Sequence, residues 1–304
     1  MRYLNLRLIF VLIILCVPRT LLAEDLKKHI KGKDDAMMAL IPAGTYDMGS
    51  DDEDLIETAP THRVYINDFY MDVHPVTNEQ FAEFLNKTKP PEGPDGARDW
   101  LVVLRTDLND PERKHWWPTE IAYEKGKYVA YKGYRDHPVI SVSWNAAYEY
   151  CEWAEKRLPT EAEWEKAARG GLKGKKFVWG NEIPTSEIIH GKVWDNNRHA
   201  APLGPAKSGR PNGYGLYNMA GSVWEWCFDW YHADYYVNSM RKDPQGPESG
   251  RFKVVRGGSW FNNAPGLRVA LRNFLDFMAL DETTGFRCVS DVPREKKETV
   301  KENK

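Results

Sequence analysis

Short apolar runs separated by glycine and asparagine dominate the chain from Phe177 onward, and few stretches there have helical spacing. Such runs predict short strands joined by wide loops. Nine of the 12 tryptophans lie between Trp144 and Trp260. Because an indole has a large apolar body and an N–H that needs a partner, we expect irregular backbone held together by large aromatic side chains.

Three segments nevertheless fit short amphipathic helices: 77–85, 145–156 and 160–170. The first and third begin with a capping box, Thr-x-x-Gln and Thr-x-x-Glu, and two glycines stop the third. The stretches 38–50 and 62–70 alternate between apolar and polar residues and favour short strands. No internal repeat and no low-complexity linker interrupts this part of the chain.

The two ends of the chain differ from the rest. Residues 1–23 have the basic start, the apolar run of about ten residues and the small residue at a cut site that are typical of a secretory signal peptide; an uncleaved anchor is the alternative. Residues 24–36 are expected to form a polar linker, and 293–304 a charged, solvated tail. The folded unit is therefore predicted at 37–292, in a secreted or periplasmic protein without a stable membrane span after cleavage.

The overall composition excludes several classes of function. With 42% hydrophobic and 28% charged residues and a formal net charge of -2, the chain is typical of a soluble globular protein and gives no electrostatic reason to expect nucleic acid. Its eight histidines form no HxH, HxxxH or HExxH pair, so a local zinc motif is absent. The four cysteines leave open two disulfides, one metal site, or a reactive pair with a spare bridge.

Six blocks in a fixed order resemble the sulfatase-modifying factor family, also called the formylglycine-generating-enzyme family. They are IPAGTYDMGS (41–50), FYMDVHPVTNEQFAEFL (69–85), HPVISVSWNAAYEYCEWAEKRLPTEAEWEKAARGG (137–171), NGYGLYNMAGSVWEW (212–226), VVRGGSW (254–260) and GFRCVSD (285–291). The resemblance implies a single α+β domain, loop-rich and low in regular secondary structure, that is related to the C-type lectin fold.

Members of this family that make formylglycine oxidise a sulfatase cysteine with a copper ion held by two cysteines, just after the GGS block. Asn262 and Leu267 stand at the positions that match those two cysteines. An amide oxygen and an alkyl group cannot replace two thiolates for Cu(I). We therefore expect the fold without copper and without the classical cysteine oxidation.

The resemblance also assigns the remaining cysteines. Cys151 and Cys288 match the two halves of a structural disulfide in some members, with two buried free thiols as the alternative; an oxidising compartment favours the bridge. Cys16 lies inside the apolar run of the signal peptide. Cys227 has no evident partner and is expected to be a buried small hydrophobe.

A structural calcium site is the cofactor that the resemblance implies. Its ligands would be the side chains of Asn218 and Glu225 with the main-chain carbonyls of Gly221 and Val223, a set of hard oxygen donors. The alternative is a turn stabilised by the asparagine, with the glutamate on the surface.

A ligand groove is expected in the segment after the GGS block, which lines the peptide cleft in the family. Amides, guanidinium groups and an indole there could hold a peptide or a glycan. The residues are Ser259, Trp260, Asn262, Asn263, Arg268, Arg272 and Asn273. The alternative is that the two arginines brace the core against Asp276 or Asp291.

Three functions are compatible with this sequence. The first is an exported binding or accessory maturation factor for a peptide or protein client, without copper oxidase activity. The second is a periplasmic oxidoreductase that uses the same scaffold for another oxidation, as pyoverdine-maturation relatives are thought to do. The third is a lectin-like ligand-binding protein, similar to the variable proteins of diversity-generating systems. All three rest on fold-level analogy.

Overall fold

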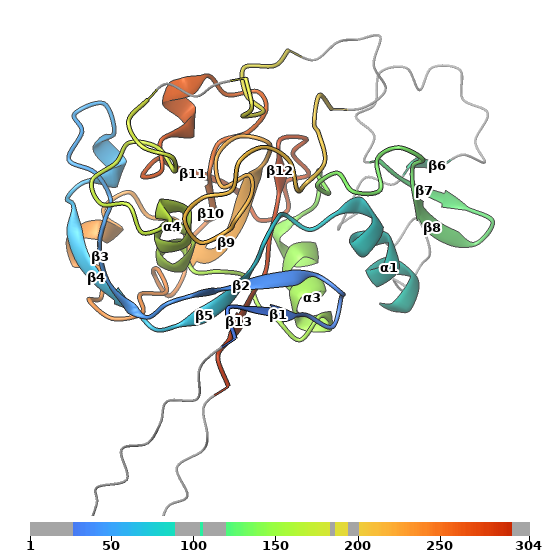
Figure 1. Ribbon diagram of the computed structural model, residues 1–304, viewed down its shortest axis with the longest axis horizontal. Helices are drawn as coiled ribbons and strands as arrows, with labels where there is room; N and C mark the ends of the chain where they lie inside the picture. The colour runs from blue at the N-terminus through green and yellow to red at the C-terminus, as the bar shows by residue number, and fades with distance from the viewer. Residues whose placement is uncertain (1–26, 89–103, 106–119, 183–185, 194–200, 294–304) are drawn as a thin grey trace, which may run out of the picture.

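The computed structural model describes residues 27–88, 104–105, 120–182, 186–193 and 201–293 (Figure 1). The signal peptide expected at 1–23 and nearly all of the tail expected at 293–304 fall outside them. Within the described residues, no helix is both long enough and apolar enough to cross a membrane.

In the part of the chain that the structure describes, three α-helices and three short 3₁₀ helices are separated by strands of two to seven residues. The helices are α1 Asn78–Thr88, α3 Trp144–Trp153, α4 Glu161–Arg169, η1 Ile56–Thr58, η3 Tyr235–Asn238 and η4 Ala264–Leu267. The strands are β1 His29–Lys31, β2 Met37–Ile41, β3 Gly44–Met48, β4 His62–Ile66, β5 Phe69–Asp72, β6 Leu104–Arg105, β7 Ile121–Glu124, β8 Lys127–Ala130, β9 Trp224–Trp230, β10 Phe252–Arg256, β11 Arg272–Asp276, β12 Thr284–Gly285 and β13 Val289–Asp291.

These strands form four small sheets. Two are four-stranded, with the orders β1-β2-β5-β13 and β11-β10-β9-β12, and two are smaller, β3-β4 and β6-β7-β8. Most neighbours are antiparallel, but β12 pairs with β9 and β6 with β7 in parallel. The architecture is the loop-rich α+β fold that the resemblance implied.

The sheet β11-β10-β9-β12 separates two apolar cores. Alternate residues of a strand point to opposite faces, so Val254 on β10 packs into one core with Trp164 of α4, whereas Val255 packs into the other with Tyr150 of α3. Figure 1 shows α4 beside β9 and β10, and α3 nearer to β13. Helices α4 and α3 therefore each contribute to one of the two cores.

Helix α4 is buried along its whole length, although five of its nine residues are charged. The capping box predicted at Thr160 and Glu163 is present, and Gly170 ends the helix in the left-handed conformation with φ 57°. Since a buried charge needs a partner, a central helix of this composition requires a network of ion pairs around it.

The expected linker is part of the fold from residue 27 onward. Strand β1 pairs with β2, and Asp34 is only 5% exposed. The Lys156 ammonium lies 2.7 Å from a carboxylate oxygen of Asp34 and 2.7 Å from one of Asp72. The folded unit thus begins before the predicted boundary at residue 37, because β1 is paired in a sheet and Asp34 is paired inside the protein.

Cys151 of α3 and Cys288, one residue before β13, form a disulfide across a sequence separation of 137 residues. Both cysteines are fully buried. The pairing that the resemblance implied is confirmed, and it ties α3 to the sheet that contains both ends of the folded unit.

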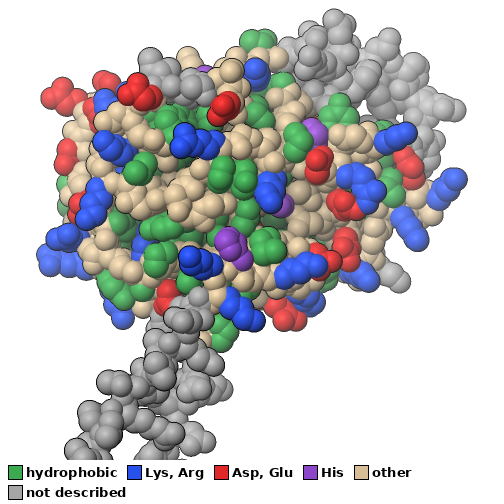
Figure 2. All heavy atoms as spheres, in the orientation of Figure 1, with side chains coloured by type: hydrophobic (Ala, Val, Ile, Leu, Met, Phe, Trp, Pro, Cys, Tyr) green, Lys and Arg blue, Asp and Glu red, His purple; other side chains and the backbone are tan. Residues whose placement is uncertain are grey.

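Positive and negative side chains are interspersed over the face of the molecule seen in Figure 2, with apolar side chains exposed between them. No large basic patch gathers on that face. The charge on this face is mixed, in agreement with the small net charge of the chain.

Candidate functional site

The chain turns sharply at the GGS block, where β10 ends. Gly257 and Gly258 have φ angles of 101° and 73°, and a Cβ at Gly258 would meet the carbonyl oxygen of Gly266. Only glycine fits this approach. The turn therefore folds the segment after β10 back onto η4.

Asn262, the first of the two positions that match the copper-binding cysteines of the family, stabilises this turn with its side chain. Its Oδ1 accepts hydrogen bonds from the main-chain N–H of Ser259 at 2.9 Å and from the Ser259 hydroxyl at 2.8 Å. Leu267, the second position, is fully buried in the core that contains Trp164. The two residues thus do not share an open cleft, and neither supplies a thiolate.

Trp260 lies inside the protein and does not line a groove. It is 2% exposed, packs with Ile140 and Val223, and donates its Nε1–H to the carbonyl of Glu282 at 3.2 Å. Its neighbour Phe261 is 62% exposed. The aromatic side chain that this segment offers to solvent is therefore Phe261, which the sequence analysis did not select.

A second exposed apolar side chain comes from the loop 186–193. The main chains of the two segments pair, with Gly191 N–H donating to Asn262 and Lys192 N–H to Trp260, both at 2.8 Å. Val193 is 80% exposed, and Asn263 is exposed as well. Phe261, Asn263 and Val193 are thus exposed side chains on two segments whose main chains are paired.

The remaining groove candidates do not converge there. Arg268 reaches toward Asp52 and Asp54, each at 3.4 Å, and lines a cavity of about 440 Å³. Arg272 and Asn273 are consecutive on β11 and therefore point to opposite faces of the sheet. The predicted groove of seven residues is not a single surface.

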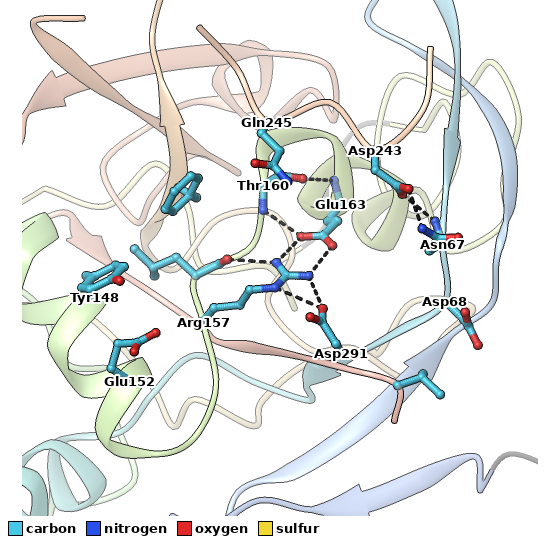
Figure 3. Close-up of a pocket in the computed structure, with 13 residues that line it drawn as sticks. Asn67, Asp68, Tyr148, Glu152, Arg157, Thr160, Glu163, Asp243, Gln245 and Asp291 are labelled. Carbon is cyan, nitrogen blue, oxygen red and sulfur yellow. Dashed lines mark hydrogen bonds and ion pairs between the residues drawn. The ribbon is translucent and has the colours of Figure 1, made fainter. Parts of the chain in front are cut away.

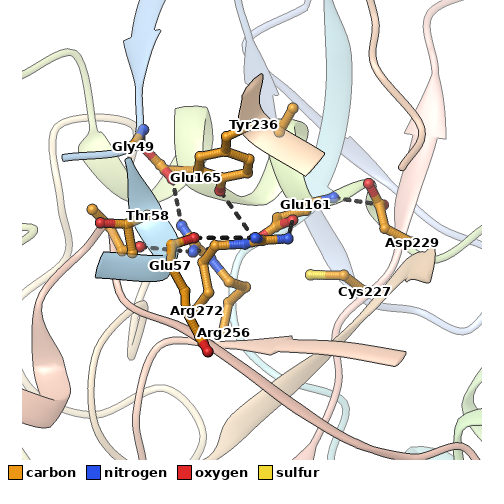
Figure 4. A network of polar contacts seen from close by, with 12 residues as sticks. Gly49, Glu57, Thr58, Glu161, Glu165, Cys227, Asp229, Tyr236, Arg256 and Arg272 are labelled. Carbon is orange, nitrogen blue, oxygen red and sulfur yellow. Dashed lines mark hydrogen bonds and ion pairs between the residues drawn. The ribbon is translucent and has the colours of Figure 1, made fainter. Parts of the chain in front are cut away.

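Arg272 instead belongs to a buried ionic network between α4 and the sheet (Figure 4). Its Nε and Nη2 donate to the two carboxylate oxygens of Glu161 at 2.7 and 2.9 Å. Arg256 on β10 donates to Glu165, and the Tyr236 hydroxyl to Glu161 at 3.1 Å. The expectation that Arg272 could brace the core is right in kind, but its partner is Glu161 and not Asp276 or Asp291.

Asp229 and Cys227 lie on β9 beside this network. The Asp229 carboxylate accepts the main-chain N–H of Glu161 at 2.8 Å. Burial, with the nearby charge of Glu161, raises the pKa of Asp229 to about 8. Burial likewise raises the pKa of the Cys227 thiol, so Cys227 stays protonated at neutral pH, as expected of a buried hydrophobe.

The donor set expected for calcium does not fit at Glu225. This carboxylate is fully buried; Arg287 donates to both of its oxygens at 2.7 and 2.8 Å, and Trp164 Nε1–H donates to one at 2.8 Å. A dication would have to share the carboxylate with a guanidinium of the same sign. Across the described residues, no three His, Cys, Asp or Glu side chains are grouped to hold a metal.

The other residues of that set have local roles. The Asn218 amide donates to the carbonyl of Ala206 at 2.9 Å, and Val223 packs with Trp260. Arg287, which the sequence analysis missed, is the partner that determines the role of Glu225. A signal was present, because Arg256 and Arg287 are charged residues inside apolar strand-like runs, where a buried ion pair is the usual explanation.

A family comparison agrees with this fold. Residues 23–292 match the model of the family described as "Sulfatase-modifying factor enzyme 1-like domain". The match covers most of the chain, and the chain belongs to this family.

Several characterised relatives are similar in sequence. The chain is 37% identical to "Formylglycine-generating enzyme" of Thermomonospora curvata, over 84% of this chain and 93% of the relative. It is 39% identical to "Serine/threonine-protein kinase pkn1" of Chlamydia pneumoniae, over 84% of this chain but only 38% of that longer protein. It is 33% identical to "Inactive C-alpha-formylglycine-generating enzyme 2" of Mus musculus, over 87% and 89% of the two chains.

Solved structures share the fold at lower identity. PvdO from Pseudomonas aeruginosa superposes with a TM-score of 0.64 and 22% identity, over 87% of this chain and 98% of that one. Treponema denticola variable protein 1 superposes with a TM-score of 0.59 and 23% identity, over 84% and 95%. These structures support the architecture alone.

Proposed function

We propose that this family member is an exported binding or accessory maturation factor for a peptide or protein client, without copper-dependent oxidation of cysteine. The observation that carries the proposal is the state of its cysteines. Copper oxidation in this family requires two thiolates at one site, because soft sulfur ligands select Cu(I). The folded unit contains three cysteines, and none of them can form such a pair.

None of the three cysteines is available as a thiolate ligand for copper. Cys151 and Cys288 are bonded to each other. Cys227 is buried, and its raised pKa keeps the thiol protonated. Since the thiolate is the metal ligand and the nucleophile, a single protonated thiol inside the core supports neither copper binding nor oxidation. That a relative is named as inactive is in keeping with such a loss within the family.

A role in binding is supported by the surface formed by Phe261, Asn263 and Val193. Exposed apolar side chains bordered by polar groups are typical of sites that bind other molecules. The arrangement offers an aromatic ring for packing and an amide for hydrogen bonds to a main chain. Export is proposed from the pattern of residues 1–23, and a buried disulfide suits an oxidising compartment.

The experiment incubates the purified full-length mature protein with Cu(I) and a peptide that carries the CxPxR motif. The Thermomonospora relative serves as the positive control. We expect no aldehyde by mass spectrometry and no stoichiometric copper by elemental analysis. Copper-dependent conversion of the peptide, abolished by Cys227→Ser, would refute the proposal.

Binding is measured separately with the same peptide, its cysteine replaced by serine and its end labelled with a fluorophore. Phe261→Ser is expected to weaken binding at least fivefold. Val237→Ser is the matched control, because Val237 is 65% exposed on η3 and is not part of this surface. Equal effects of the two substitutions would exclude the Phe261 surface as the binding site.

A further inference from the structure

A second concave surface lies on another part of the molecule. It is a cavity of about 600 Å³ bordered by α3, by the turn between α3 and α4, and by the end of β13 (Figure 3). No residue of the expected groove at 259–273 lines it. A ligand bound in this cavity would therefore contact a different set of residues from a ligand bound at the Phe261 surface.

The cavity is strongly acidic. Five of its lining side chains are carboxylates: Asp68, Glu152, Glu163, Asp243 and Asp291. Arg157 is the cation among the lining residues. Among the lining side chains, five carboxylates stand against one guanidinium, so their summed formal charge is negative.

Arg157 has no hydrogen-bond donor left for a ligand. Its Nη1 and Nη2 bind the two oxygens of Glu163, each at 2.7 Å. Its Nη2 and Nε bind Asp291 at 2.7 and 3.1 Å, and Nη1 also reaches the carbonyl of Leu158 at 3.3 Å. These contacts use the five N–H donors of the guanidinium. An anionic ligand would therefore meet only carboxylates.

Asp243 and Glu152 add two further carboxylates to the lining of the cavity. Asp243 is held in place by the main-chain and side-chain amides of Asn67. Lys166 lies near Asp243, and its ammonium donates to the carbonyls of Gly44 and Ile66. Burial lowers the pKa of Lys166 to about 8. Glu152 is exposed and forms no ion pair within the part of the chain that the structure describes.

One wall of the cavity is aromatic, and its rings lie near the ammonium group of a lysine. Tyr148 and the 37% exposed Phe228 line the cavity, and Trp144 stacks on Tyr148 with ring centroids 5.3 Å apart. The Lys253 ammonium lies 3.9 Å from the centre of the Trp144 ring and 5.3 Å from that of Phe228. The faces of such rings attract ammonium and guanidinium groups. Tyr148 also stands one helical turn before Glu152, on the same side of α3.

We propose that this cavity binds a lysine or arginine side chain within a basic segment of a partner polypeptide. The carboxylates supply the charge, and the ring of Tyr148 or Phe228 packs against the side chain. Gln245, an exposed lining residue, offers an amide for the partner's main chain. A metal ion is a poor occupant, because the carboxylates do not converge in a group of three within the described residues.

The test is fluorescence anisotropy on the full-length mature protein with labelled hexalysine, and with hexaglutamate as the charge control, in about 0.15 M salt to suppress long-range attraction. Glu152→Lys reverses one charge in the cavity. Glu149→Lys is the matched control, since Glu149 is exposed on the same helix but does not line the cavity. We expect Glu152→Lys to weaken hexalysine binding at least fivefold and Glu149→Lys less than twofold.

A second variant tests the aromatic wall without a change of charge. Tyr148→Leu is expected to weaken hexalysine binding about threefold, while the melting temperature of the protein checks that the fold is intact. Equal losses for Glu152→Lys and Glu149→Lys, or binding of hexaglutamate as tight as that of hexalysine, would overturn the proposal. Removal of residues 294–304 tests whether the chain's own basic tail, and not an external partner, occupies the cavity. If that deletion raised hexalysine affinity tenfold, the cavity would belong to the chain's own basic tail and the external partner would be excluded.

Discussion

The most informative single change is Glu225→Gln, because Glu225 pairs with Arg287 in the structure, whereas the family resemblance implied a calcium ligand at this position. In the structure it accepts three charge-assisted or indole hydrogen bonds of 2.7–2.8 Å in a fully buried site. Removal of one member of a buried ion pair costs about 3–5 kcal/mol, since the other charge is left uncompensated. For a domain near this size, that loss lowers the melting temperature by roughly 6–20 °C.

The partner substitution completes a double-mutant cycle. Arg287→Met alone should be similarly destabilising, because it leaves the carboxylate buried without a counter-charge. The double variant replaces the pair by neutral groups and should lose less free energy of unfolding than the sum of the two single variants, by at least about 2 kcal/mol. Urea denaturation of the four proteins, each with EGTA and with added calcium, measures both the coupling and any contribution of calcium.

Two results would refute this reasoning. One is a melting temperature of the unaltered protein that falls by several degrees in EGTA while Glu225→Gln no longer responds, which would make Glu225 a calcium ligand. The other is strict additivity of the two single substitutions. Additivity would mean that the short contacts between Glu225 and Arg287 carry no energetic coupling.

Two further predictions concern the disulfide and a buried carboxyl group. Replacement of both Cys151 and Cys288 by alanine removes a cross-link over 137 residues and should lower the free energy of unfolding by up to about 5 kcal/mol through chain entropy. Urea denaturation measures the loss, and Cys227→Ala is the control for removal of a buried cysteine. A loss of stability no larger than that of the control would contradict the prediction. Burial raises the pKa of Glu120 to about 8, above the pKa of a glutamate in the unfolded chain. The protonated Glu120 therefore stabilises the folded protein fully below about pH 4. This stabilisation is lost as the pH rises to 8, by up to about 1.4 kcal/mol per pH unit. Glu120→Gln should reduce this slope, because the neutral amide replaces the protonated acid beside Asn78; a slope equal to that of the unaltered protein would disprove the assignment.

The helices could be predicted from the sequence because their signals are local. Thr160 and Glu163 specify a capping box within four residues, and the structure has both of its hydrogen bonds. The Cys151–Cys288 bridge could be inferred from family resemblance, although no local pattern specifies a pairing over such a distance. The short strands could be expected only as a class, since their partners are set by tertiary contacts.

The candidate groove could not be predicted well, for a physical reason. Spacing indicates which side of a regular element a residue occupies, but Trp260 and Arg268 lie in irregular backbone, where direction depends on individual φ angles. In sequence, Asp34 looks like a solvated charge, and nothing near Arg272 indicates which carboxylate it pairs with. Their burial depends on Glu161 and Lys156, which are more than a hundred residues away.

The placement of the first and last strands in one sheet has a consequence for how such a unit can be joined to others. In the order β1-β2-β5-β13, three strand spacings of about 4.8 Å separate the outer strands, so the chain enters and leaves the domain roughly 14 Å apart. A unit with neighbouring ends can be inserted into a larger polypeptide, or fused at either end, without strain on its core. The longer Chlamydia relative, of which this chain matches 38%, is in keeping with such modular use.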